Sequence, residues 1–224
     1  GNNSFSITCT GAGGSRSASV IVEGYRETNG VVVDGYISGA EICIDEDESW
    51  TCDSDENLTT TDNEGKFTIR YANGNLVSIG GTDLDSQTLL DNLLITHKLT
   101  GHSDFKAVTP VTSIAAFMED ASLVNLALGI DSSIDVFTFD PVANKGDGGI
   151  NDYLYEKGNQ LTVLSFALQN ITNNLNTTNE TTEDYFKAIT KEIEKEYTET
   201  KTKVDIETEA FVIKALDNVI QQNH

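Results

Sequence analysis

The chain has 224 residues, of which 36 are acidic and 14 are Lys or Arg, so its net charge is −22 and its pI is about 4.2. A surface this acidic argues against binding to nucleic acid or to anionic membranes. No apolar run approaches the ~20 residues that a membrane span needs. The shortage of basic residues and a closely spaced cysteine pair predict a secreted, extracellular protein of the cell surface, with its signal peptide already removed.

Residues 1–24 predict a β-hairpin, because apolar residues alternate with polar ones on both sides of a glycine-rich turn. These residues are Phe5, Ile7 and Cys9 before the turn and Ala18, Val20 and Val22 after it. The segment TCTGAGGSRSASVIV resembles the closing hairpin of bacterial immunoglobulin-like modules. Three interpretations remain open: the end of an upstream domain, a strand that residues 4–23 donate to a neighbouring copy, or a hairpin paired with the sheet that follows.

Residues 25–107 predict an antiparallel β-sandwich, because short alternating or β-branched runs are separated by glycine-containing turns. The expected strands cover residues 31–33, 36–37, 41–44, 66–71 and 76–79. Asp62 and Gly65 predict a tight turn before Lys66, since Asp can cap its own turn and Gly tolerates a positive φ.

The stretch between residues 41 and 64 carries ten acidic residues and no Lys or Arg. Six of its residues stand at positions 1, 3, 5, 7, 9 and 12 of a twelve-residue loop, which is the ligand spacing of an EF-hand-type calcium site. They are Asp45, Asp47, Ser49, Thr51 (through its carbonyl), Asp53 and Glu56. Position 6, usually Gly, is Trp50. The spacing predicts a Ca²⁺ site, and the alternative is a solvated acidic loop.

Cys43 and Cys52 bracket this loop. A bond between them would close a ten-residue ring, for which the chain-entropy model gives about 2.5–3 kcal/mol of stabilisation. We expect this disulfide, and two buried thiols are the alternative. Cys9 has no evident partner within the chain.

The segment GYISGAEICIDEDESWTCDSDENLTTTDNEGKFTI is similar to a recurring module of large bacterial surface proteins and adhesins, a β-sandwich of the carboxypeptidase-regulatory or transthyretin-like type. Segments 81–85, 108–112, 128–130 and 139–141 resemble later parts of the same module and occur in the same order, so the resemblance covers roughly residues 35–175. It implies an extracellular, calcium-stabilised structural role and no catalytic residues.

Residues 108–224 predict a helical region, because the apolar period changes to about 3.6 after Pro110. The expected helices begin after Thr109 and cover 123–128, 150–175, about 183–199 and about 205–221. The 150–175 stripe is typical of a core-facing helix, with an exposed coiled-coil seam as the alternative.

No catalytic motif occurs, and the three histidines lie outside any metal-ligand spacing, so we do not expect an enzyme. Asp83 with Asp85, or Asp147 with Asp152, is a further cation candidate, with solvated loops as the alternative.

The sequence therefore predicts an α+β protein made of a hairpin (1–24), a β-sandwich (25–107) and a helical region (108–224). We expect a non-enzymatic structural or adhesive protein of the bacterial cell surface, stabilised by Ca²⁺, whose partners are neighbouring copies or domains of the same assembly. Two alternatives are a self-assembling filament subunit that uses N-terminal strand exchange, and a carbohydrate- or protein-binding module.

Overall fold

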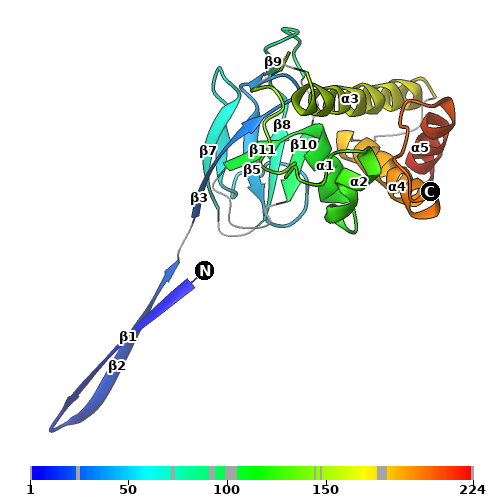
Figure 1. Cartoon of the computed structure of the whole chain (residues 1–224). Coiled ribbons are helices and arrows are strands. Elements are labelled where there is room, and N and C mark those ends of the chain that lie inside the picture. The colour runs from blue at the N-terminus through cyan, green and yellow to red at the C-terminus, as the bar shows by residue number, and fades with distance from the viewer. Residues whose placement is uncertain are drawn as a thin grey trace.

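The computed structural model confirms the α+β class, with strands in the N-terminal part and helices in the C-terminal part (Figure 1). The structure describes residues 2–23, 26–71, 74–90, 94–98, 105–143, 145–146, 148–175 and 181–222. No described helix combines the length and the apolar character needed to cross a membrane.

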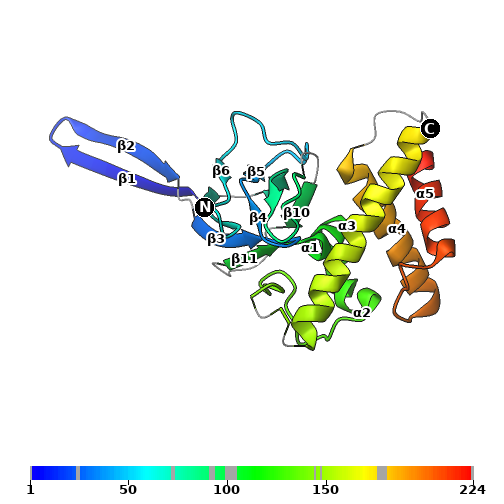
Figure 2. The ribbon, with the colours of Figure 1, turned by 90° about the horizontal axis from the view of Figure 1, so that it is seen from above.

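The N-terminal hairpin consists of β1 (Asn2–Gly11) and β2 (Gly14–Glu23), which pair antiparallel along their whole length. It extends away from the rest of the molecule as a two-stranded ribbon (Figures 1 and 2). Residues 4–21 are all exposed. The predicted hairpin is confirmed, but among the described strands it pairs only with itself and does not join the sheet that follows.

Two sheets form the body of the β-region. The first has the order β10-β8-β5-β6, with every neighbouring pair antiparallel. Its strands are β10 (Leu94–Lys98), β8 (Asn75–Ile79), β5 (Glu41–Asp45) and β6 (Leu58–Thr60). The second has the order β11-β3-β7, made of β11 (Phe105–Val108), β3 (Arg26–Val32) and β7 (Lys66–Tyr71). A short pair, β4 (Ile37–Ser38) with β9 (Thr82–Asp83), completes the region.

The second sheet corrects the prediction of a wholly antiparallel sandwich, because β11 runs parallel to β3. Alternation along a strand identifies the buried face but carries no information on the direction of its neighbour. The predicted turn before β7 is present: Asp62 Oδ1 accepts hydrogen bonds from the N–H groups of Glu64 (2.8 Å) and Lys66 (2.9 Å), and Gly65 has a φ of 73°.

The helical region begins at α1 (Pro110–Phe117), directly after β11. Thr109 and Thr112 form a reciprocal capping box at its start, in which each side-chain oxygen accepts from the other residue's N–H, and Pro110 occupies the first turn. A 3-10 turn, Ala121–Leu123, leads into α2 (Val124–Leu128), which ends at Gly129. The first helix and this short helix were both predicted.

Three longer helices follow: α3 (Ile150–Asn174), α4 (Thr182–Thr200) and α5 (Glu209–Gln222). The apolar stripe of α3 faces the core over most of its length, since Leu154, Leu161 and Leu168 are buried, which supports the core-facing interpretation over an exposed seam. The last helix starts four residues later than predicted. Asp205 caps a local turn at the N–H of Glu207, and Thr208 Oγ1 then accepts from the N–H of Phe211.

One continuous hydrophobic core joins the sheets to the helices. It includes Val32 from β3, Ile42 and Ile44 from β5, Phe67 from β7, Leu76 from β8, Ile114 from α1, Leu161 from α3 and Phe186 from α4. The β-region and the helical region are therefore packed as one body, from which only the hairpin projects (Figure 2).

Candidate metal centre

The acidic loop connects β5 to β6 and begins at Asp45, the last residue of β5. Strand pairing fixes this residue at the edge of the core, and its side chain is fully buried. The two carboxylate oxygens accept hydrogen bonds from the backbone N–H groups of Ser49 and Trp50, both at 3.1 Å. Burial raises the pKa of Asp45, and these two hydrogen bonds oppose that rise. Asp45 therefore shapes the loop around its own carboxylate.

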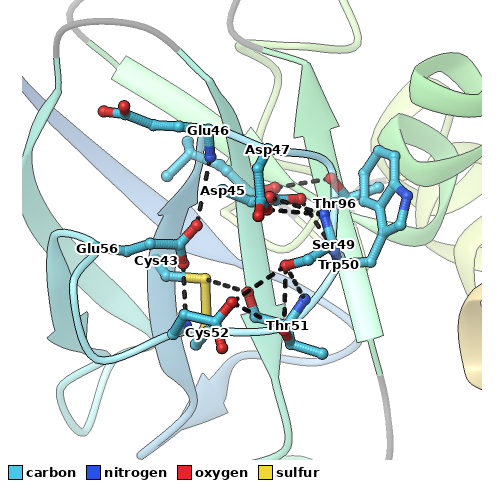
Figure 3. The surroundings of a disulfide bond; sticks show 12 residues. Cys43, Asp45, Glu46, Asp47, Ser49, Trp50, Thr51, Cys52, Glu56 and Thr96 are labelled. Carbon is cyan, nitrogen blue, oxygen red and sulfur yellow. Dashed lines mark hydrogen bonds between the residues drawn. A yellow bond between two sulfur atoms is a disulfide. The ribbon is translucent and has the colours of Figure 1, made fainter.

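Glu56 closes the other end of the loop. Its Oε1 accepts from the N–H of Glu46 (3.3 Å) and its Oε2 from the N–H of Asp53 (3.1 Å), so the carboxylate turns back toward Asp45 (Figure 3). Burial raises the pKa of Glu56. The first and last predicted ligands of the loop thus lie at the same place.

Asp47 is the third member of the cluster. It is exposed, and its Oδ1 accepts from the N–H of Ser49 at 3.1 Å. The Ser49 side chain, and after it this backbone contact, lower the pKa of Asp47. One carboxylate oxygen from each of Asp45, Asp47 and Glu56 lies within 4.8 Å of the other two. Two ligands of one Ca²⁺, each at 2.3–2.6 Å, can be no more than about 5 Å apart, so this spacing fits a shared cation.

The other three predicted ligands form a second group beside the cluster. Ser49 Oγ lies 3.0 Å from Thr51 Oγ1, and both hydroxyls donate to Asp53 Oδ2 at 3.4 Å. The structure therefore brings together three of the six predicted ligands as candidate metal-binding carboxylates. It links the remaining three to one another by hydrogen bonds.

None of the ion pairs in the described part of the chain involves Asp45, Asp47 or Glu56. Three neighbouring carboxylates without a basic partner repel one another, and the buried member has lost most of its hydration. A divalent cation is the simplest species that would offset both costs.

Trp50 adopts the backbone conformation that position 6 requires, with a φ of 58°. A side chain in the left-handed region costs roughly 1–2 kcal/mol, which explains why Gly is usual there. Its indole compensates by packing on Phe117 of α1, with ring centroids 4.8 Å apart, and Lys187 of α4 lies over the ring at 5.5 Å. Trp50 therefore anchors the loop on the helical region, a role that the ligand spacing did not indicate.

Cys43 and Cys52 form the expected disulfide, with a Cα–Cα distance of 5.5 Å (Figure 3). Cys43 is buried with Val77, and Trp50, Cys52 and Ile79 pack around this pair in a small cluster of their own. The bond holds the second half of the loop against β5. Cys9 is a free, exposed thiol.

No protein-family model matches the chain, and no curated protein matches it. Among solved structures, the chain is similar to a crystal structure of a variant of BcpA, the major pilin subunit of Bacillus cereus, with 14% identity and a TM-score of 0.26. The likeness covers 47% of this chain and 36% of the pilin, so the chain spans about a third of that protein's length. A likeness at this TM-score is too weak to assign a fold or a function.

Proposed function

We propose that this chain is a non-enzymatic structural or adhesive protein of the bacterial cell surface, stabilised by Ca²⁺ in the β5–β6 loop. The observation that carries the proposal is the convergence of Asp45, Asp47 and Glu56 within 4.8 Å, one of them fully buried. We also propose that the β-region belongs to the calcium-binding, transthyretin-like modules that the loop sequence resembles.

The ligand chemistry favours Ca²⁺ over other metals. The cluster offers only oxygen, which suits hard cations, and the loop contains no His or free Cys that would favour zinc. Ser49, the Thr51 carbonyl and Asp53 would supply further oxygens, since Ca²⁺ takes six to eight ligands. The disulfide is consistent with an extracellular location, where disulfides persist. A weak calcium site would suffice there, because extracellular modules bind Ca²⁺ with dissociation constants of about 10⁻⁴–10⁻³ M.

The loop's contacts suggest what bound calcium would do. The loop is attached to β5 by the disulfide and to α1 and α4 by Trp50. A cation held by Asp45, Asp47 and Glu56 would neutralise the carboxylates and stiffen the loop between these attachments. Calcium would therefore strengthen the connection between the sheets and the helices.

A thermal melt with calcium and with EGTA tests this proposal. At 100 times its dissociation constant, Ca²⁺ should stabilise the protein by about 2.7 kcal/mol, and each kcal/mol corresponds to roughly 2–4 °C in Tm for a chain of this size. We expect the shift to disappear in Asp47→Asn. It should persist in Asp55→Asn, which removes an acidic residue of the same loop that is not a predicted ligand. An equal shift in both variants, or none in the native chain, would refute the calcium site.

The projecting hairpin favours a second function, assembly with other copies through strand pairing. Phe5 lies opposite Val20, and Ile7 opposite Ala18, so these side chains share one face of the ribbon. Phe5, Ile7 and Val20 are 59%, 66% and 58% exposed, and because they share one face they form a contiguous apolar patch of the kind that marks interaction surfaces. Both strands also leave an edge without a described partner.

Size-exclusion chromatography and negative-stain imaging of the chain with and without residues 1–24 test assembly. The full chain should form larger species, and the truncated chain should be monomeric. The double variant Phe5→Ser/Ile7→Ser should also be monomeric, whereas Ser6→Ala/Thr8→Ala, on the opposite face, should still assemble. Assembly of the chain without residues 1–24, or a full chain that stays monomeric, would refute strand exchange.

A further inference from the structure

A second site lies away from the acidic loop, in an open cavity of about 700 Å³ between α3 and the segment around β9. Asp34 lines it from the turn after β3. Asp83 lines it from the end of β9, and Asp85 lies two residues further along the chain. Lys145, Tyr155 and Thr162 line the opposite side. Gly35 has a φ of 72°, and a Cβ there would meet Asp83 Oδ1 at 2.0 Å, so this glycine lets the Asp34 turn lie directly against β9.

Two polar atoms of this cavity are buried without a hydrogen-bond partner among the described residues. They are Asp34 Oδ1 and Thr162 Oγ1. The Asp34 residue as a whole is partly exposed, but its Oδ1 atom is buried. A buried polar atom left unsatisfied is costly, and a buried carboxylate oxygen especially so, which makes each of these atoms a position where a ligand could donate a hydrogen bond.

The neighbouring polar groups do not bond to these two atoms, because those groups are hydrogen-bonded or ion-paired with one another. Asp83 accepts from the N–H of Asp85 (2.9 Å) and from the N–H and Oγ of Ser86 (3.3 and 2.5 Å). Asp85 forms an ion pair with Lys145 and accepts from the hydroxyl of Tyr155 at 2.8 Å. The Asp83–Asp85 pair, predicted as a cation candidate, is thus engaged by Ser86, Lys145 and Tyr155. In the other predicted pair, Asp147 lies outside the described residues.

The cavity is negative and partly apolar. Three carboxylates face one basic side chain, Lys145, and the wall is completed by Leu90, Val163 and Phe166. We propose that this cavity binds a small organic ligand with a protonated amine, whose N–H groups donate to Asp34 and Thr162 and whose apolar part lies against Phe166. An ammonium group supplies three donors and a positive charge, which a neutral hydroxyl compound does not.

The ionisation of Asp34 gives this proposal a pH signature. Burial raises the pKa of Asp34 from 3.8 to about 6, the neighbouring Thr162 hydroxyl opposes this rise, and the nearby charge of Asp83 adds to it. Asp34 is therefore mostly ionised at pH 7.5 and mostly neutral at pH 5. The other groups facing it are Asp83, Asp85, Lys145 and Tyr155. A primary amine stays protonated throughout this range, so its binding should weaken on acidification.

Calorimetric or NMR titration of the full chain with butylamine and benzylamine, and with the matching neutral alcohols, tests the proposal. We expect the amines to bind at pH 7.5, the alcohols to bind at least about tenfold more weakly, and amine binding to fall at pH 5. Asp34→Asn should weaken amine binding about tenfold or more, and Val163→Trp, which fills the cavity from the exposed face of α3, should abolish it. Glu199→Gln, at an exposed position on α4, is the matched control and should bind normally.

Amine binding that is unchanged in both Asp34→Asn and Val163→Trp would overturn the proposal, as would equal binding of amines and alcohols. The absence of amine binding at pH 7.5 would likewise overturn it. These outcomes are independent of calcium, because none of the residues changed here lies in the β5–β6 loop.

Discussion

Trp50 combines a left-handed backbone conformation with a large apolar side chain that contacts the helical region. The loop needs a left-handed backbone at this position, and the helical region needs an apolar anchor from the loop. Gly would meet the first demand without strain but would supply no contact to Phe117 or Lys187. The aromatic residue at an otherwise unfavourable position thus indicates that fixing the loop to the helices outweighs the local strain.

Substitution of Trp50 separates these two contributions. Trp50→Ala should lower the free energy of unfolding by about 1–3 kcal/mol, less than a fully buried Trp would cost, because the packing on Phe117 is lost while the strained backbone remains. Trp50→Gly loses the same packing but relieves the strain, so it should be more stable than Trp50→Ala by about 1 kcal/mol. Urea denaturation of the three proteins measures both differences. A Gly variant less stable than the Ala variant would contradict this assignment.

Asp34 should make stability depend on pH in a definite direction. Its folded-state pKa of about 6 exceeds the unfolded value of 3.8, so the folded state binds the proton more tightly. The stabilisation from this proton is therefore present at low pH and is lost as the pH rises through 6. Asp34→Asn should accordingly be more stable than the native chain at pH 7.5, by at most ~3 kcal/mol.

This advantage of Asp34→Asn should fall by roughly half at pH 5, since Asp34 is then largely protonated in the folded protein. Urea denaturation at both pH values measures the free energy of unfolding of each protein. Subtracting the native value from the Asp34→Asn value at the same pH cancels the contribution of the other carboxylates. An advantage that is equal at both pH values, or that grows on acidification, would show that Asp34 does not titrate as its surroundings indicate.

At the scale of the elements, the helices and the hairpin were predictable and several strands were not. The periodic pattern of α3 extends over 25 residues, and its apolar stripe remains clear despite the single Lys157. In contrast, β6 and β9 have only three and two residues, too few for alternation to be recognised, and neither was predicted. The parallel pairing of β11 with β3 depends on the path of the chain after β10. A local residue pattern does not indicate that path.

The candidate metal centre was predictable in its location but not in its geometry. Ligand spacing identified the loop, and the cysteine positions identified the bond that closes it. Which carboxylates converge is decided by the backbone, including the left-handed conformations of Glu48 and Trp50. The cavity at Asp34 had no sequence signal, because its lining comes from a turn, a short strand and a helix that are distant along the chain.

For the whole molecule, the shared core and the projecting hairpin have different proposed roles. The core makes the sheets and helices one body, so a cation in the β5–β6 loop would stabilise the entire body through Trp50 and the disulfide. The hairpin stands outside this core and would serve contacts with other molecules (Figure 2). With a net charge of −22, calcium would also reduce the repulsion that opposes compact folding.

Isothermal titration of Ca²⁺ into the chain after EGTA treatment is the sharpest test of the calcium site in the β5–β6 loop. We expect one Ca²⁺ per chain at the loop, with a dissociation constant of about 10⁻³ M or tighter. This binding should be lost in Asp47→Asn and retained in Asp55→Asn. The absence of a saturable site, or equal binding by both variants, would contradict it and would leave the β5–β6 loop as a solvated acidic segment held by its disulfide.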